Sequence, residues 1–167
     1  MRRALRFLLP VLLALAVVAQ VRRSSDLMRA QHLLWSVEQR TMVMLRTGAL
    51  DKLRLRANLK ALADARKLDY AEVAIPTLMG SQHLMLGELE LARRAYATAN
   101  LLEPRPEILV NLGKVNYSQG ATKRALRDFS QAVLLDPRLM QEVPKDFRQL
   151  VSDALRSQDD ANGADEN

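Results

Sequence analysis

The feature that most constrains the fold is a pattern of small and aromatic residues that occurs twice, in residues 73–105 and in residues 106–137. In each copy a hydrophobic residue precedes a glycine, a second glycine follows, an alanine stands four positions before an aromatic residue, and an acidic residue precedes a proline. The equivalent pairs are Met79-Gly80 and Leu112-Gly113, Gly87 and Gly120, Ala92-x3-Tyr96 and Ala125-x3-Phe129, and Glu103-Pro104 and Asp136-Pro137. A repeated unit of this length is one supersecondary motif, so we expect similar units to stack side by side.

Each copy has the pattern of two short helices joined by a tight turn. In the second copy Leu109, Leu112 and Val115 lie on one helical stripe, a spacing that buries one face of an amphipathic helix. Gly120 then ends the first helix, because glycine readily adopts the left-handed conformation of a helix end. The second helix ends at Asp136, because the residue before a proline disfavours the α region. The sequence shows no sustained period-two alternation, so strands are not expected.

This pattern resembles the tetratricopeptide repeat (TPR), in which W-x2-L-G-x2-Y is followed by A-x3-F and a proline. The matching residues of the second copy are Leu112-Gly113, Ala125-x3-Phe129 and Pro137, while Leu109 replaces the tryptophan and Asn116 the tyrosine. The resemblance covers residues 73–137. It implies an all-α fold, a short α-solenoid of antiparallel helical hairpins, whose concave surface binds an extended or helical segment of a partner protein.

The same resemblance implies which residues line that groove, because the first helix of each repeat faces it. We expect partner contacts from Thr77, Ser81, Leu84, Met85, Val110, Asn111, Lys114, Tyr117 and Ser118. Leu78 stands where Asn111 stands in the next copy, so no asparagine ladder is expected. Lys114 alone is not the basic clamp that some family members use for a C-terminal carboxylate. The alternative for each residue is ordinary exposed surface.

Residues 24–72 are interpreted as a degenerate hairpin that covers the first repeat, because two repeats alone bury too little surface for stable folding. One helix is expected from caps at Ser24 and Ser25 to about Thr47, and a second from Asp51 to about Tyr70. The expected core positions are Leu27, Ala30, Leu34, Val37, Thr41, Leu45, Leu55, Leu59 and Leu62, with Leu50, Leu53, Ala57 and Ala61 beside them. Trp35 is expected to pack in the core. For Met42, Met44, Met79 and Met85 core filling is favoured over an adaptable binding surface.

The second helix of this hairpin carries a basic face that includes Arg54, Arg56 and Lys60. A solvated helix face is the favoured interpretation. The alternative is contact with anionic lipid headgroups, because the hairpin follows a candidate membrane segment.

Residues 1–23 are predicted to be a transmembrane anchor or a signal peptide. The apolar run from Phe7 to Ala19 has arginines on both sides, and the candidate span from Ala4 to Val21, in which Arg6 can snorkel to the interface, is near the lower limit of roughly 17–25 residues. Val17-Val18-Ala19 before Gln20 also fits a cleavage site. Both alternatives stay open, and they predict an exported protein that is anchored in the inner membrane facing the periplasm, or periplasmic after cleavage.

At the other end, residues 138–156 are expected to form a capping helix and residues 157–167 a disordered acidic tail. Pro144 can begin the last helix. Its expected apolar stripe is Phe147, Leu150, Val151, Ala154 and Leu155.

Several function classes are disfavoured by the composition. The absence of cysteine excludes disulfides, thiolate zinc sites and cysteine nucleophiles. His32 and His83 lack companion ligands at metal spacing, and no nucleophile, base and orienting group fall together, so neither a cofactor nor catalysis is expected. The net charge of +6 includes five arginines of residues 1–23, and aromatics are only 4%, which argues against nucleic-acid binding.

The sequence therefore predicts a non-enzymatic adaptor that binds another protein in a bacterial cell-envelope complex. Two alternatives remain, namely a self-associating structural subunit, in which case the chain is a homo-oligomer, and a binder of anionic membrane through the basic face.

Overall fold

The computed structural model describes the backbone of residues 2–164 and the side chains of residues 12–157. The described chain is helical and contains no strand, which confirms the expected all-α class. Its α-helices are α1 (Arg2–Thr47), α2 (Lys52–Leu68), α3 (Ala74–Met85), α4 (Leu89–Leu102), α5 (Pro106–Ser118), α6 (Thr122–Leu135) and α7 (Arg148–Ala164). Two 3-10 helices, η1 (Pro137–Glu142) and η2 (Lys145–Phe147), lie between α6 and α7.

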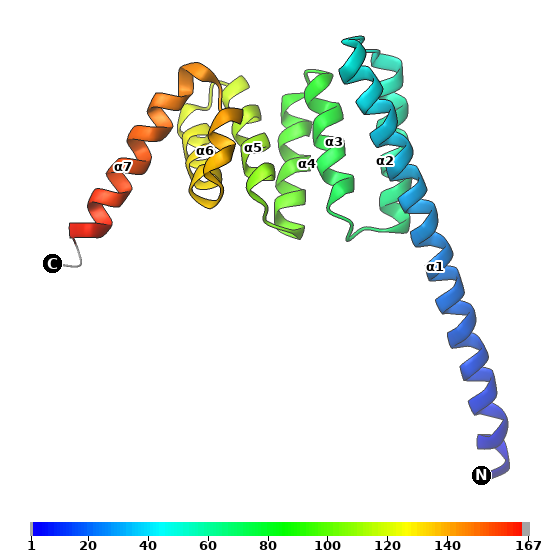
Figure 1. The fold of residues 1–167 in the computed structure, drawn as a ribbon. Helices are drawn as coiled ribbons and strands as arrows, with labels where there is room; N and C mark the ends of the chain where they lie inside the picture. The colour runs from blue at the N-terminus through cyan, green and yellow to red at the C-terminus, as the bar shows by residue number, and fades with distance from the viewer. Residues whose placement is uncertain (1, 165–167) are drawn as a thin grey trace.

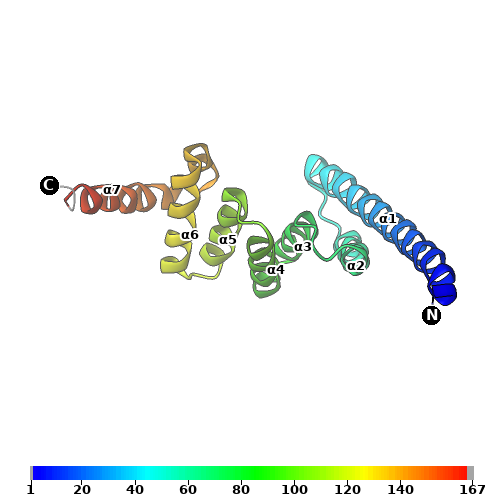
Figure 2. The same ribbon diagram turned by 90° about the horizontal axis from the view of Figure 1, so that it is seen from below.

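Consecutive helices pair as antiparallel hairpins, α1 with α2, α3 with α4, and α5 with α6, and the hairpins stack in one row (Figure 1). Seen from below, the row is bounded by α1 at one end and α7 at the other (Figure 2). The predicted α-solenoid is therefore confirmed.

The spacing of glycine and aromatic residue in each repeat is explained by close helix packing. A Cβ at Gly113 would lie 2.6 Å from the Cδ1 and Cε1 atoms of Phe129, and one at Gly80 would lie 2.8 Å from the ring of Tyr96. Only a glycine leaves room for the ring there, because real Cβ contacts are longer than this. Gly120, in the turn between α5 and α6, has the positive φ of 70° expected of a helix end.

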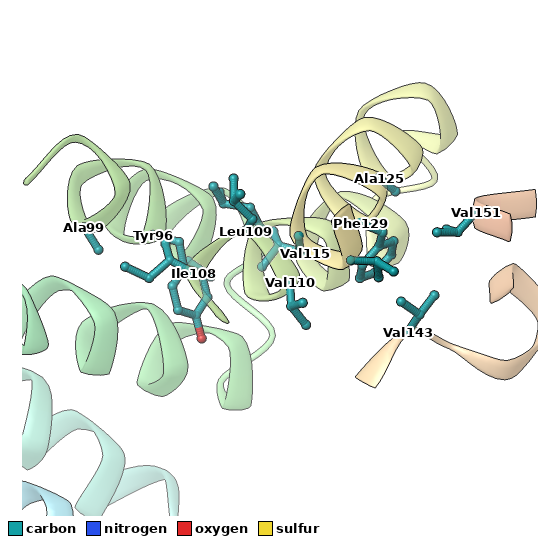
Figure 3. Close-up of a cluster of buried hydrophobic side chains, with 14 of the residues drawn as sticks. Tyr96, Ala99, Ile108, Leu109, Val110, Val115, Ala125, Phe129, Val143 and Val151 are labelled. Carbon is teal, nitrogen blue, oxygen red and sulfur yellow. The ribbon is translucent and has the colours of Figure 1, made fainter. Parts of the chain in front are cut away.

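Two clusters of buried side chains hold the row together. One extends from α4 through α5 and α6 to α7, with Phe129 and Val115 fully buried near its centre (Figure 3). The other joins α1, α2 and α3 and includes Val37, Leu62 and Ile75. The first hairpin is thus packed onto the repeats, as the stability argument for residues 24–72 requires.

The predicted start of the first hairpin is wrong. Helix α1 runs unbroken from Arg2, so Ser24 and Ser25 lie inside it and are not N-caps. Neither glycine nor proline occurs between Gln20 and Thr47, so nothing in the chain there interrupts the helix. The cap at Asp51 is confirmed, because its side chain accepts hydrogen bonds from the backbone N–H groups of Leu53 and Arg54.

Several predicted core positions of the hairpin are also wrong. Trp35 is 59% exposed and does not pack in the core. The buried positions of α1 are Ala30, Leu34, Val37, Thr41 and Met44. Met44 therefore packs in the core where Leu45 was expected to. The residues expected in or beside the core that are exposed instead are Leu27, Met42, Leu45, Leu50, Leu53 and Ala57.

The C-terminal region differs from a single capping helix. Pro144 is the N-cap of η2, and Phe147 and Val151 are buried while Leu150 is exposed. Helix α7 continues to Ala164, past Ser157, where a disordered tail was expected. The hydrogen bond from Ser157 Oγ to the carbonyl oxygen of Asp153 fits this continued helix. Residues 165–167 of the expected tail lie outside the described residues.

The N-terminal part of α1 projects away from the hairpins (Figure 1). Its described apolar side chains are exposed, namely Leu12, Leu13, Leu15, Val17, Val18 and Val21. Within the part of the chain searched, which is its described residues, no helix has a stretch long and apolar enough to span a bilayer. The expected span begins at Ala4, and the side chains of residues 4–11 lie outside the described ones, so the anchor or signal peptide stays a prediction.

Candidate functional site: a groove between the first helices of the hairpins

A groove of about 650 Å³ lies between α1, α3 and α5, the first helices of the three hairpins. Its position follows from the hairpin stacking, which places the first helices of successive hairpins side by side along one face of the row. The residues that line it are Glu38, Gln39, Thr41, Met42, Leu45, Leu78, Ser81, Leu84, Met85, Tyr96, Asn111 and Lys114.

The lining is mainly apolar, with a few polar groups. Met42 and Leu45 come from α1, and Leu78, Leu84 and Met85 come from α3. Methionine side chains are flexible and polarisable, so they adapt to partners of different shape. Charged groups come from Glu38 and Lys114. The side-chain amides of Gln39 and Asn111 can both donate and accept hydrogen bonds. This combination suits a segment that has apolar side chains on one face and polar groups beside them.

One buried polar contact lies in the groove. The hydroxyl groups of Ser81 and Tyr96 are 3.0 Å apart and share a hydrogen bond. Burial raises the pKa of the Tyr96 phenol above its ordinary value of 10.0, so the phenol stays neutral at physiological pH. The ring of Tyr96 packs under Gly80, which ties this part of the groove to the repeat packing itself.

The walls are fixed by a buried hydrogen-bond network between three helices. Gln82 on α3 donates from Nε2 to Thr41 Oγ1 on α1 at 3.0 Å, and Asn58 on α2 donates from Nδ2 to Gln82 Oε1 at 3.1 Å. Gln82 and Asn58 are fully buried. Sequence reasoning missed Asn58 and Gln82 because a polar residue does not mark a buried position in a hydrophobic pattern.

Six of the predicted groove residues lie along this face. Ser81, Leu84, Met85, Asn111 and Lys114 line the groove itself. Thr77 lines an adjoining hollow of about 360 Å³ that also contains Glu38 and Asn111. The α1 residues Glu38, Met42 and Leu45 were not predicted to line it, because the resemblance covers only residues 73–137 and α1 is outside it.

The remaining predicted groove residues are placed differently. Val110 is buried, because the C-terminal segment with Val143 and Phe147 packs on that side of α5, so it is not an accessible contact. Tyr117 donates from its hydroxyl to the carboxylate of Asp146, and its ring lies edge-on to Phe147 with centroids 5.4 Å apart. Ser118 donates from Oγ to the carbonyl oxygen of Lys114.

Lys114 is engaged by the same C-terminal segment. Its Nζ lies 2.7 Å from Glu142 Oε2, and this contact lowers the pKa of the Glu142 carboxyl. The chain's own residues therefore cover the α5 side of the groove near Lys114 and Tyr117. The open, apolar part lies between α1 and α3.

The predicted basic face is partly paired with acids. Arg56 donates a hydrogen bond to Glu88, whose carboxylate also accepts one from His83 Nδ1 at 2.7 Å, so this cluster joins α2 to the turn between α3 and α4. Arg54 contacts Asp51 at 3.3 Å, and Lys60 is exposed. Across the described residues, no three histidine or acidic side chains come together as a metal site.

Comparisons with known proteins point to one fold. No family model and no curated protein sequence matches this chain. The TPR domain of Arabidopsis OM64 superposes with a TM-score of 0.60, at 16% identity, over 80% of this chain and 98% of that domain. A thermophilic TPR protein of Thermus thermophilus superposes with a TM-score of 0.53, at 27% identity, over 68% of this chain. The match covers 58% of the Thermus chain, so it concerns only part of that protein.

Proposed function

We propose that this chain is a tetratricopeptide-repeat adaptor that binds a segment of another protein, and its similarity in fold to two proteins with such repeats supports this. The observation that carries this proposal is the apolar groove between α1 and α3, lined by Met42, Leu45, Leu84 and Met85. Apolar side chains that remain accessible in a folded chain favour association with a partner that removes them from water.

The rigidity of the groove supports the same function. Its two walls are joined by the buried bonds among Thr41, Asn58 and Gln82, so the surface exists before a partner arrives. A preformed surface loses little conformational freedom on binding, and that raises affinity without further contacts. The partner segment that fits has apolar side chains that contact the methionines and leucines of the groove. It also has polar groups that form hydrogen bonds with Glu38 and Asn111.

The finer parts of the proposal concern place and mechanism. We infer that the adaptor is non-catalytic and belongs to a complex of the bacterial cell envelope. Residues 4–21 anchor the adaptor in the inner membrane, with the hairpins in the periplasm. If residues 4–21 are cleaved off, the adaptor is a periplasmic protein. The support is the apolar, arginine-flanked sequence of residues 1–23.

A pair of variants tests the binding surface. Met42→Glu with Met85→Glu places two charges in the groove without removing a fully buried side chain, and Val43→Glu with Leu53→Glu is the control, since both of these are exposed and outside the groove. A partner first isolated by cross-linking from the native envelope is titrated against each full-length variant. We expect the groove variant to bind at least about tenfold more weakly, the effect of about 1.4 kcal/mol. Equal weakening in both variants would contradict the assignment of the groove.

A further inference from the structure

Exposed apolar residues also occur at one edge of the solenoid, where one hairpin is connected to the next. We call this the connection edge and define it as residues 67–70, 101–105 and 134–138. Leu101 is 85% exposed and Leu134 is 64% exposed. Tyr70, Leu102 and Leu135 at the same edge are also exposed. Single exposed leucines are ordinary, but here a pair of them recurs at the second and third connections, and a tyrosine is exposed at the first.

Leu101 of α4 and Leu134 of α6 occupy equivalent positions in their repeats, because the two helices end with the same hydrogen bond. The last helical turns of α2, α4 and α6 close in the same way, with the N–H groups of Asp69, Glu103 and Asp136 bonded to the carbonyls of Ala65, Ala99 and Ala132. Lys67, Leu101 and Leu134 each stand two residues before these ends. The fold therefore sets a lysine and two leucines along one line of the surface.

The projecting part of α1 leaves the molecule on the side of this edge (Figure 1). Leu68, at the end of α2, lines the same hollow as Leu15, Val18 and Arg22 of α1. The first connection of the edge therefore lies beside the place in α1 where the apolar residues end and Arg22 and Arg23 begin. A helix rises about 1.5 Å per residue, so α1 before Arg22 is about 30 Å long, the thickness of a bilayer hydrocarbon core.

The charges at the edge are compatible with a lipid surface. Arg105 lies 2.7 Å from Glu103, and Arg138 lies 2.9 Å from Asp136, so the acids at the second and third connections are each paired with an arginine, while Asp69 at the first accepts a backbone hydrogen bond from Ala71. Arg66 and Lys67 add positive charge in the last turn of α2, next to Arg22 and Arg23. Positive charge attracts anionic headgroups, and tyrosine is favoured at the membrane interface.

We propose that the connection edge rests on the surface of the bilayer, with Leu101, Leu134 and Tyr70 inserted among the lipid headgroups. This inference rests on the membrane attachment proposed above. Transmembrane helices are commonly tilted by about 20°, and such a tilt brings the second and third connections toward the surface. In this arrangement α1 and the edge are two points of contact with the bilayer, which orients the groove relative to the membrane.

The chain contains no cysteine, so a single introduced cysteine carries a fluorescent probe at one known position. The test labels Val17→Cys in the apolar part of α1, Leu101→Cys and Leu134→Cys at the edge, and Leu53→Cys as the control. Leu53 is 82% exposed and lies at the start of α2, at the opposite end of that helix from the edge. Each full-length variant, labelled with an environment-sensitive dye, is reconstituted in vesicles of phosphatidylethanolamine and phosphatidylglycerol that contain brominated lipid.

We expect the brominated lipid to reduce the fluorescence at positions 17, 101 and 134 and to leave position 53 unchanged. Quenching at position 17 alone would show that the anchor is correct and the edge is not on the membrane. No quenching at position 17 would refute the anchor and the edge together, and equal quenching at position 53 would also overturn the edge. Circular dichroism checks each fold, and Leu102→Cys or Leu135→Cys replaces any edge variant that loses helicity.

Discussion

At the scale of single residues, the contact between a glycine and an aromatic ring decides how closely the two helices of a repeat approach. The sequence predicts this pair well, because the requirement is steric and depends only on spacing within the hairpin. Gly113 and Phe129 were identified from the pattern, and the ring lies where a Cβ on Gly113 would be. Ala125 and Ala132, on the same stripe of α6 as Phe129, are fully buried as expected.

Gly113→Ala should lower the free energy of unfolding by about 1–3 kcal/mol, because the added methyl group overlaps the ring of Phe129. Ser118→Ala, at the exposed end of the same helix, is the control. A denaturant titration followed by circular dichroism measures both. In a background of Phe129→Leu, which replaces the ring with a smaller aliphatic side chain, the penalty of Gly113→Ala should shrink. An undiminished penalty there would mean that the cost arises elsewhere.

The sequence predicts single residues poorly where polarity and burial disagree. Trp35 was expected in the core because of its size, yet it is exposed. Asn58 and Gln82 were not expected in the core, yet both are fully buried. Their partners come from three helices, so no spacing within one helix could reveal them.

At the scale of elements, the first hairpin is joined to the first repeat by polar contacts as well as by apolar packing. The network of Thr41, Asn58 and Gln82 crosses from α1 and α2 to α3. Helix boundaries set by glycine or by a residue before proline were predicted closely, because those residues act locally. The start of α1 was not, because serines inside a helix resemble caps when only the sequence is read.

Gln82→Leu should destabilise the chain by about 1–3 kcal/mol, because it removes the closer of two acceptors of the buried Asn58 Nδ2 and one donor to Thr41 Oγ1. The triple variant Thr41→Val, Asn58→Leu, Gln82→Leu should recover most of this loss, since no polar group is then left unpaired. Thermal melting of the parent and both variants provides the comparison. A triple variant no more stable than Gln82→Leu would show that the network is not the cause.

At the scale of the whole molecule, carboxylates paired with basic groups link the stability of the chain to pH. The pKa of Glu90 is lowered to about 2, first by its hydrogen bond from Arg93 and then by that from Arg94. The pKa values of Glu88, Glu103 and Asp136 are lowered by His83, Arg105 and Arg138. Such groups stabilise the folded state above the pKa they have when unfolded, and the stabilisation is lost as the pH falls through the folded pKa.

The melting temperature should therefore hold steady above about pH 4.5 and fall between about pH 4.5 and pH 2 as these carboxylates are protonated. Glu90→Gln should show a smaller fall over that interval than the parent chain, because the group that titrates is missing. Scanning calorimetry at a series of pH values measures this. A melting temperature that rises on acidification would contradict these ion pairs.

The whole molecule also sets which part of the groove is open. The resemblance gave five residues that line it, but it could not show that η1 and η2 engage Lys114 and Tyr117, since that contact joins segments far apart in the sequence. The open surface therefore lies nearer α1 than the repeats alone suggested.

The most direct test of the adaptor proposal is to map where the partner lies on the full-length chain in the native envelope. A photo-cross-linking amino acid is placed at Met42 or Met85 in the groove, or outside the groove at Ser118, at the exposed end of α5, or at Val43. Mass spectrometry then identifies the cross-linked peptides. The proposal predicts that one partner segment is captured from positions 42 and 85 and not from positions 43 and 118. Capture from position 43 with none from positions 42 and 85 would contradict it.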